Sequence, residues 1–550
     1  MTETTVAATA PVEVRLSAVT GGEVVVAALA AHDVDVVFGI PGTHNLSVFA
    51  ALHRYAVRTV ATTHEQGAGY AADGYARTSG RPGVLVVTSG PAVFNAATAL
   101  AQAYSDSVPV LLVSPGMPRS LTTGGPGTGY LHEAKDQTGA MERIVELCLR
   151  PITHQGIADA IADAFARMGS GRPRPCQVEV PLDLLEEVGD AVVRRVATSA
   201  PTGAPGPDVA AAADALVAAA DVVIVAGGGA RGASAPLREL AEELSAPVVT
   251  TINGIGSLDG DHPLALGQRL WSQPVMDAVA AADVVLVVGS ELAQSDLFNG
   301  PLEPRGRVVR VDVDPRMHDV NVVADLTLVG DAASTLAALV EAVRERVPQV
   351  RPQQDRRELR HAADAAARDF GRRWLPWVDA IQRGLDDDAI VATDNAMCVY
   401  YGLLPNLVAH GPASVHFPTG FGTLGYTVPV AIGAQLAAPA RQVVGVSGDG
   451  GLLFTVTELA TAAAEGLPIA VVVFDNGGYG EIRNEMLDRG ETPTAVAAPP
   501  RDLVLLATSL GAHGVRVENP DQLTAELATA RTRTGPTVVV VPETRREEKA

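Results

Sequence analysis

Eight short apolar runs constrain the fold of this chain more than any other feature of its sequence. They are rich in valine and run into turn-forming glycine, serine, aspartate or proline. They span residues 83–91, 108–116, 221–229, 283–290, 307–315, 442–450, 468–478 and 536–543. Continuous rather than alternating apolarity is typical of strands buried on both faces, as in parallel sheets. Alanine-rich helical stretches such as 208–220 and 457–466 lie between the runs, so the sequence predicts a doubly wound α/β fold.

Two stretches without periodicity resemble linkers. Residues 197–209 are rich in proline, glycine and alanine, and residues 347–358 are polar and contain proline. They divide the chain into segments of similar size, each with strand and helix patterns, which is compatible with a chain of 550 residues. We therefore predict three tandem doubly wound domains with mainly parallel sheets. The predicted ranges are a flexible N-terminus at 1–14 and domains at 15–195, 205–345 and 365–550.

Composition excludes several classes of protein. The formal net charge of −22 argues against nucleic acid or an anionic membrane as a partner. No apolar run is long enough to span a membrane, and the N-terminus lacks the pattern of a secretory signal. Three cysteines, Cys148, Cys176 and Cys398, make no disulfide framework. We expect a cytoplasmic protein without nucleic acid or membrane partners.

The most informative motif lies at the ends of two consecutive runs. Asp449 stands between Gly448 and Gly450 after one run, and Asn476 follows the next run, with two glycines behind it. In open parallel sheets, ligands lie beyond the carboxyl ends of the strands. A carboxylate and an amide oxygen are hard ligands that suit Mg²⁺, which prefers phosphate oxygens as its other partners. The alternative is a plain strand-to-helix turn.

This spacing resembles the signature of thiamine diphosphate enzymes. The resemblance implies that Asp449 and Asn476 bind Mg²⁺ through their side chains and Gly478 through its carbonyl oxygen. The ion would carry the diphosphate of the cofactor. A frequent family form has Asn where this chain has Asp475, but that position precedes the ligand.

A second stretch, residues 62–91, resembles the pyrimidine-binding domain of the acetohydroxyacid synthase and 2-oxo acid decarboxylase group. The resemblance implies that Glu65 contacts N1′ of the aminopyrimidine and promotes loss of the C2 proton, which generates the ylide. A partly buried carboxyl suits such proton exchange. The alternative is a helix-start glutamate that offsets the helix dipole.

A third stretch, residues 418–435, resembles the family segment beneath the cofactor. Leu424 would be the bulky residue that holds the cofactor in its V shape, and the backbone at Gly422 and Leu424 would bond the aminopyrimidine. The remaining cofactor contacts implied by the resemblance are Asn95, Asn395, Gly448, Gly450, Gly451, Tyr479 and Gly480.

The resemblance also implies a role for each predicted domain and an oligomeric state. Residues 15–195 would bind the pyrimidine, 205–345 would form the central domain, and 365–550 would bind the diphosphate. In this family the cofactor lies between first and third domains of different subunits, so the resemblance implies a homodimer at least, and often a tetramer.

Candidate substrate residues come from three places. Residues 36–53 resemble a loop that faces the substrate, which makes Thr43 and His44 candidates. His132 falls where the synthases commonly carry Gln, and an imidazole there could shuttle protons near neutral pH. His416 is a weaker candidate, and His64 is expected to be structural. For each histidine a hydrogen-bonded scaffold role remains the alternative.

Four stretches together, 39–45, 64–80, 130–137 and 479–486, look closest to the 5-guanidino-2-oxopentanoate decarboxylase branch. Glu481 and Glu485 lie one helical turn apart, after the stretch that contains Asn476 and Gly478. They could pair with a guanidinium. The alternative is a solvated helix face. Ala92 and Phe94 would narrow the pocket, which argues against a long substrate.

The central domain separates this chain from the synthases. Its glycine cluster at 226–236 could suggest a nucleotide, but residues 289–300 lack the arginine that helps the synthases bind FAD. Met397 and Cys398 also replace the usual Gln and His. We therefore do not expect FAD.

The leading prediction is a thiamine diphosphate- and Mg²⁺-dependent lyase that decarboxylates a 2-oxo acid through an ylide and an enamine and releases an aldehyde. The first alternative is a carboligating synthase of the acetolactate synthase type. Two further alternatives are a binding or regulatory protein without turnover and a nucleotide-dependent oxidoreductase.

Overall fold

The computed structural model describes residues 13–121, 127–196, 201–298, 300–346 and 356–543. The chain forms two compact units, residues 1–199 and residues 200–550. Most of the predicted flexible N-terminus, residues 1–12, lies outside the described residues, as do 197–200 and 347–355 of the two predicted linkers. Within the described ranges, no helix has both the length and the apolar character needed to cross a membrane.

The first unit is built on a six-stranded parallel sheet with the order β3-β2-β4-β5-β7-β6. Its strands are β2 (Val36–Gly39), β3 (Arg58–Ala61), β4 (Gly83–Val86), β5 (Val110–Gly116), β6 (Leu147–Leu149) and β7 (Cys176–Pro181). Its helices are α1 (Gly21–Ala31), α2 (Leu46–Leu52), α3 (Glu65–Ser79), α4 (Pro91–Ser105), α5 (Gln137–Met141), α6 (His154–Met168) and α7 (Leu182–Glu186). Two further strands, β1 (Glu13–Thr20) and β8 (Val188–Arg194), form a separate antiparallel pair.

Alternate residues of β4 face opposite sides of this sheet. Val84 and Val86 join the core cluster beneath α1 and α6, whereas Leu85 faces α3 and α4. α3 approaches α4 closely because Gly69 has no side chain, and a Cβ added there would lie 2.5 Å from the Ala99 Cβ. Burial on both faces explains why the strand is apolar at every position.

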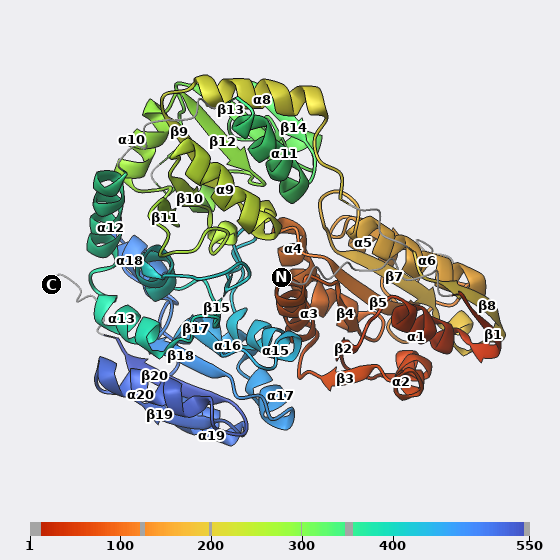
Figure 1. The fold of residues 1–550 in the computed structure, drawn as a ribbon. Coiled ribbons are helices and arrows are strands. Elements are labelled where there is room, and N and C mark those ends of the chain that lie inside the picture. Colours follow the sequence, from red (N-terminus) through yellow and green to blue (C-terminus); the bar gives the residue numbers. More distant parts are fainter. Residues whose placement is uncertain (1–12, 122–126, 197–200, 299, 347–355, 544–550) are drawn as a thin grey trace. The chain divides into compact units, whose positions relative to one another are not determined.

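The second unit contains two parallel sheets. The central sheet has the order β11-β10-β9-β12-β13-β14. Its strands are β9 (Val222–Ala226), β10 (Val248–Thr250), β11 (Ala265–Gly267), β12 (Val284–Val288), β13 (Arg307–Asp312) and β14 (Leu326–Val329), and its helices are α8 (Gly206–Ala218), α9 (Ser234–Leu244), α10 (Gln273–Ala281) and α11 (Ala332–Arg344). α8 and α11 lie side by side along one face (Figure 1), and α10 packs on the other face.

The C-terminal sheet has the order β16-β15-β17-β18-β20-β19. Its strands are β15 (Ile390–Thr393), β16 (Val415–His416), β17 (Val443–Gly448), β18 (Ala470–Asp475), β19 (His513–Arg516) and β20 (Thr537–Pro542). The helices of this part are α12 (Arg357–Gly371), α13 (Leu375–Gly384), α14 (Leu404–Asn406), α15 (Thr427–Ala437), α16 (Asp449–Thr455), α17 (Glu458–Ala464), α18 (Gly480–Asp488), α19 (Leu503–Ser509) and α20 (Pro520–Ala530). A π-helical segment, η7, spans Cys398–Leu403.

The strand orders locate the crevices where ligands bind in such sheets. Numbered from the first parallel strand of each, the N-terminal and C-terminal sheets share the order 2-1-3-4-6-5. The order reverses between β2 and β4 in one sheet and between β15 and β17 in the other. Ligands of doubly wound folds bind at such switch points, beyond the carboxyl ends of the strands. The three parallel sheets confirm the predicted fold class.

Candidate functional site

The predicted metal ligands Asp449 and Asn476 lie at the ends of neighbouring strands. β17 and β18 pair in parallel up to Gly448 and Phe474, so the residues that follow them meet at one edge of the sheet. Asp449 begins α16 and is fully buried. The Asn476 backbone N–H donates to Asp449 Oδ1 at 3.3 Å. The fold therefore brings together the two side chains that the sequence pairs.

The Asn476 amide, the Gly478 carbonyl oxygen and Asp449 Oδ1 converge beside this contact. One end of the Asn476 amide lies 3.0 Å from the Gly478 carbonyl oxygen and 3.3 Å from Asp449 Oδ1; if that end is the nitrogen, it donates to both, and if it is the oxygen, it completes a set of three acceptors. Acceptors at such distances repel one another unless a proton or a cation lies between them. An octahedral Mg²⁺ ion with oxygens at about 2.0–2.1 Å places neighbouring ligands about 2.9 Å apart. The three residues therefore fit a hard divalent ion.

Glycine is required at position 478. Its φ is +144°, and a Cβ built there would lie 2.1 Å from the Val496 carbonyl oxygen, so any side chain would be strained and would clash. Gly478 forms an isolated antiparallel bridge with Ala497, and the Tyr479 N–H donates to Val496 at 2.9 Å. These contacts fix the Gly478 carbonyl, which the family resemblance assigns to the metal.

The glycines that begin α16 allow the loop at residues 476–480 to approach. A Cβ on Gly450 would lie 3.0 Å from a ring carbon of Tyr479, and one on Gly451 would lie 2.8 Å from Asp394 Oδ2. Each Cβ would therefore crowd its neighbour. The expected contacts of Gly448, Gly450, Gly451, Tyr479 and Gly480 with the cofactor stay a prediction.

A pocket of about 250 Å³ adjoins this loop. Asn476, Tyr479, Met397 and Asn484 contribute to its lining. Met397 is one of the two residues that depart from the synthase pattern, and the other, Cys398, is buried. Burial raises the pKa of the Cys398 thiol well above its usual range, which keeps it protonated.

Arg501 is a candidate that the sequence analysis missed. Its guanidinium contacts Asp449 Oδ2 and lies 3.7 Å from Asp475 Oδ1. A buried carboxylate needs a counter-charge, and Arg501 supplies one. Its neighbours at 499–502, Pro-Pro-Arg-Asp, carry no spacing that connects it to Asp449, so the fold alone reveals the pair.

The loop with Gly422 and Leu424 is held by the residues that follow β15. Asn395 Nδ2 donates to the Thr423 carbonyl at 2.8 Å, and Asp394 accepts from the backbone N–H of the residue after Leu424 at 2.9 Å. Gly422 is exposed with a φ of +67°, and Leu424 is half-buried. Burial raises the pKa of Asp394 to about 7. The Asn395 amide group therefore supports this loop.

In the first unit, two predicted cofactor residues lie together. Glu65 begins α3, and its carboxylate accepts a hydrogen bond from Asn95 Nδ2 of α4 at 2.9 Å. His64 caps α3 by accepting from the Gln66 N–H at 3.1 Å, which is a scaffold contact. Glu65 is half-buried. Its carboxylate is thus oriented by Asn95 while part of its surface stays accessible.

His44, Ser89 and His132 form a hydrogen-bonded chain at the switch point of the N-terminal sheet. Ser89 Oγ lies 2.6 Å from His44 Nδ1 and 3.1 Å from His132 Nδ1. The two imidazole centroids are 4.9 Å apart. Burial, followed by the charge of His132, lowers the pKa of His44, which favours its neutral form. A hydroxyl between two imidazoles can pass a proton.

The sequence analysis named both histidines of this hydrogen-bonded group, His44 and His132, but it missed Ser89. The signal that could have found it is its place just after β4, opposite the loop that follows β2. Gln137 supports the turn by accepting from the Gly90 N–H at 2.7 Å and donating to Glu179 at 2.9 Å. Thr43 begins a 3₁₀ turn and is exposed, so the structure does not bring it into the hydrogen-bonded chain.

Glu481 and Glu485 share one face of α18 but differ in their surroundings. Glu481 Oε1 accepts from the Tyr401 hydroxyl at 2.5 Å, whereas the Glu485 side chain is 51% exposed and lies 3.8 Å from Arg489. Burial raises the pKa of Glu481, and the hydrogen bond from Tyr401 opposes that shift. Of the two carboxylates, Glu481 is thus the one less exposed to solvent and better placed to bind a substrate cation.

Aromatic rings gather around the partner of Glu481. The Tyr401 ring lies 5.7 Å from Trp374, 5.1 Å from Phe370 and 5.2 Å from Tyr400, measured between centroids. Tyr400 and Tyr401 come from the π-helical segment η7, a rare geometry that is frequent at functional sites. A carboxylate beside aromatic rings is typical of sites for organic cations.

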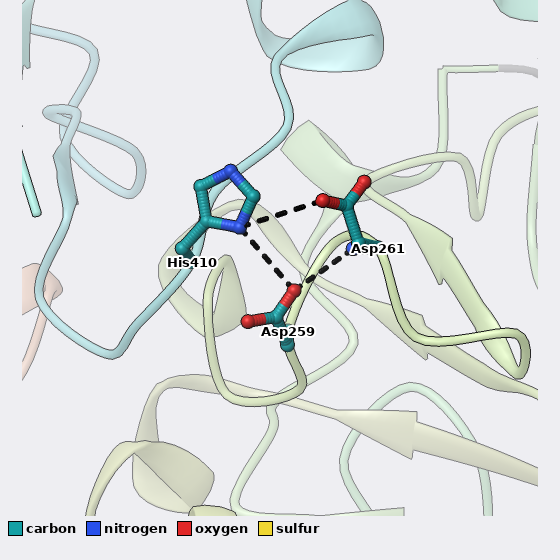
Figure 2. A group of neighbouring side chains, drawn as sticks. All are labelled: Asp259, Asp261 and His410. Carbon is teal, nitrogen blue, oxygen red and sulfur yellow. Dashed lines mark hydrogen bonds and ion pairs between the residues drawn. The ribbon is translucent and has the colours of Figure 1, made fainter. Parts of the chain in front are cut away.

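A second cluster joins two loops of the second unit. Asp259, Asp261 and His410 face one another in Figure 2. His410 Nδ1 lies 3.3 Å from Asp259 Oδ1 and 3.9 Å from Asp261 Oδ2. Both aspartates are exposed, and the Gly260 N–H donates to the Ala409 carbonyl at 2.9 Å. The contact between His410 and Asp259 and the backbone hydrogen bond tie the loops together, which explains this cluster without a metal.

The glycines of the central domain serve close packing. A Cβ on Gly227 would lie 2.2 Å from the Gly289 carbonyl oxygen, and one on Gly229 would lie 2.9 Å from the Gly289 Cα. They allow the ends of β9 and β12 to approach. The expected lack of FAD stays a prediction.

His416 ends β16, is fully buried, and accepts from Thr393 Oγ1 through its carbonyl at 2.8 Å.

Comparison with known proteins shows one family along the chain. The thiamine pyrophosphate enzyme N-terminal TPP binding domain matches residues 19–140. The central domain of the same enzymes matches residues 209–339, and the C-terminal TPP binding domain matches residues 402–541.

Individual relatives align along nearly the whole chain. A probable 2-ketoarginine decarboxylase of Pseudomonas aeruginosa is 38% identical over 539 residues, which cover 94% of this chain and 93% of that protein. An acetolactate synthase large subunit of Parasynechococcus marenigrum is 32% identical, with 95% and 87% covered. An acetolactate synthase isozyme 3 large subunit of Escherichia coli is 30% identical, with 93% and 92% covered.

Proposed function

Because this chain belongs to the thiamine pyrophosphate enzyme family, we propose that it decarboxylates a 2-oxo acid and releases an aldehyde. The substrate that we propose is 5-guanidino-2-oxopentanoate. It is also called 2-ketoarginine, the compound that appears in the name of the Pseudomonas relative. The proposed assembly is a homodimer or a tetramer, and the proposed location is the cytoplasm.

The proposed cofactors are thiamine diphosphate and Mg²⁺. Asp449, Asn476 and Gly478 would hold the ion, because one end of the Asn476 amide lies 3.0 Å from the Gly478 oxygen and 3.3 Å from Asp449 Oδ1, close to the spacing of octahedral ligands. Thiamine diphosphate, when bound, would supply the centre that adds to the keto carbon and accepts the electron pair when carbon dioxide leaves. Glu65 would bind the aminopyrimidine and exchange a proton with it, with Asn95 orienting the carboxylate.

One observation favours a decarboxylase over a carboligase, namely the chain His44–Ser89–His132. The carbon that loses carbon dioxide must gain a proton before an aldehyde can leave. Two imidazoles bridged by a hydroxyl can deliver that proton, taken from whichever imidazole is protonated, and be recharged from solvent. A carboligase instead needs to keep that carbon unprotonated until a second carbonyl compound arrives.

Glu481 supports a substrate with a cationic end. A guanidinium could pair with its carboxylate and stack on the aromatic rings around Tyr401. Glu485, more exposed on the same helix face, would add long-range attraction.

Product analysis tests this function. Purified protein with thiamine diphosphate, Mg²⁺ and 5-guanidino-2-oxopentanoate should release carbon dioxide and 4-guanidinobutanal in equal amounts, as measured by NMR. Pyruvate, branched and aromatic 2-oxo acids serve as comparison substrates. Acetolactate or an acyloin as the main product would favour the synthase alternative, and bound cofactor without carbon dioxide release from any substrate would favour a binding protein.

The variant Ser89→Ala tests whether aldehyde release depends on the hydrogen-bonded group His44–Ser89–His132. It should slow aldehyde release about 10²-fold, because the hydroxyl between the imidazoles is lost, and raise the acyloin fraction. Ser47→Ala is the control, since the Ser47 hydroxyl has no hydrogen-bond partner among the described residues. Equal aldehyde rates in the two variants would contradict a proton-transfer role for Ser89.

Substrate choice should depend on Glu481. Glu481→Gln should raise the KM for 5-guanidino-2-oxopentanoate roughly 10- to 150-fold, because a hydrogen bond to a charged group contributes about 1.5–3 kcal/mol. The KM for an uncharged 2-oxo acid should change little. Glu485→Gln is the matched comparison and should change the guanidino KM less than about threefold, as for exposed charges. The same loss for charged and uncharged substrates would refute cation recognition.

A further inference from the structure

The metal-binding side chain of Asn476 has two chemically different ends, and only one can serve a cation. In one orientation its Nδ2 donates to Glu543 Oε2 at 3.3 Å and its oxygen faces Gly478 and Asp449; in the other its nitrogen donates to Gly478 and Asp449. An amide can turn over at little steric cost, because its oxygen and nitrogen are nearly equal in size. What holds the oxygen toward the metal position therefore matters for binding.

Glu543 is placed and oriented by contacts of its own. It follows β20, its side chain is 7% exposed, and its backbone N–H donates to the Asp475 carbonyl at 3.0 Å. Its Oε1 accepts from Trp374 Nε1 and from an Arg373 guanidinium nitrogen, both at 2.9 Å. The two oxygens thus have separate tasks, and Oε2 is directed at Asn476.

The two orientations of the Asn476 amide compete. If it turned over, its nitrogen would donate to Gly478 O at 3.0 Å and Asp449 Oδ1 at 3.3 Å, which would satisfy the amide without a cation. The same turn would place the amide oxygen against the Glu543 carboxylate, acceptor against acceptor. Glu543 thereby disfavours the orientation that fills the metal position with an NH₂ group.

We propose that Glu543 is a positioning residue that holds the Asn476 amide with its oxygen toward the metal. The inference rests on the proposed metal site and adds to it the residue that follows the last strand. Partners that orient metal ligands typically change metal affinity 10- to 100-fold when they are removed. Glu543 touches neither substrate nor ion in this scheme and acts only through Asn476.

The variant Glu543→Gln reverses the contact without changing its size. Trp374 and Arg373 both donate, so they would keep the oxygen of the new amide in the place of Oε1. The new NH₂ group would then face Asn476 and favour the turned amide. We expect Mg²⁺ to bind 10- to 100-fold more weakly in a calorimetric titration at fixed thiamine diphosphate. An affinity equal to that of the unmodified protein would overturn the inference.

A second pair of variants separates positioning from a general structural role. In Asn476→Asp both ends of the side chain are oxygens, so no orientation needs to be held. Adding Glu543→Gln to Asn476→Asp should therefore leave Mg²⁺ affinity unchanged or improve it, because the new NH₂ group can donate to the second oxygen. A loss of affinity in both backgrounds would show that Glu543 is only structural.

Two controls complete the test. Trp374→Phe removes one donor to Glu543 Oε1 but leaves Oε2 and the contact from Arg373 intact, and it should change Mg²⁺ affinity less than the roughly tenfold minimum for removing a partner that orients a ligand. A tenfold loss in this variant would count against the division of tasks between the two oxygens. Melting without metal shows whether each variant folds. Failure of the unmodified protein to bind Mg²⁺ would instead refute the proposed metal site, which distinguishes the two ideas.

Discussion

A Glu65→Gln variant should lose about 10²- to 10⁴-fold of its rate of cofactor C2 proton exchange, and its decarboxylase activity should fall with it. The magnitude is that of losing a group that exchanges a proton in the rate-determining event. The amide keeps the shape of the carboxyl and can still accept from Asn95 Nδ2, but it cannot exchange a proton with the aminopyrimidine. Hydrogen–deuterium exchange at C2, quenched with acid and read by NMR, measures the effect directly.

The competing role for Glu65 is to offset the dipole at the start of α3. That role contributes only about 0.3–1 kcal/mol to stability, so it predicts a small fall in melting temperature and unchanged exchange. Glu23 provides the control, because it lies in the first turn of α1 and pairs with Arg54 at 3.0 Å. Glu23→Gln should keep the full exchange rate. Undiminished exchange in Glu65→Gln would leave the helix role as the explanation.

Physical patterning explains why the sheets could be predicted. The run at 221–229 contains β9 (Val222–Ala226), and the run at 83–91 contains β4 (Gly83–Val86). A strand apolar at every position needs cover on both faces, and only helices on both sides of a parallel sheet provide it. The antiparallel pair of β1 and β8 escaped prediction because most of β1 is exposed, so it forms no continuous apolar run.

Some residues of the candidate site could also be predicted from the sequence, and others could not. Asp449 and Asn476 could be paired from sequence because each follows a strand and the strands are consecutive. Ser89 and Glu543 also follow strands, but β4 and β20 are not consecutive in sequence with β2 and β18, the strands that precede His44 and Asn476, and Arg501 follows no strand directly. Helical spacing placed Glu481 and Glu485 on one face, but burial beside Tyr401 distinguishes them, and burial depends on the tertiary fold.

The largest effect on cofactor binding should come from Asp449→Asn. The side chain is fully buried and directs Oδ1 toward the converging oxygens and Oδ2 toward Arg501. The substitution keeps the shape but removes the charge that attracts Mg²⁺. Because residues that only orient ligands already change affinity 10- to 100-fold, we expect loss of a ligand charge to weaken Mg²⁺-dependent binding of thiamine diphosphate by about 100-fold or more.

Thermal melting with and without ligands measures this loss. A ligand present at 100 times its Kd stabilises a protein by about 2.7 kcal/mol, so Mg²⁺ with thiamine diphosphate should raise the melting temperature of the unmodified protein and leave Asp449→Asn nearly unchanged. The metal-free variant should also melt earlier, because Arg501 loses its buried partner. Asp475→Asn is the matched control: Asp475 Oδ1 lies 3.7 Å from the same arginine and its Oδ2 accepts from Arg516 at 3.5 Å, so its ligand-induced rise should persist. A full rise in Asp449→Asn would mean that the ion is held elsewhere.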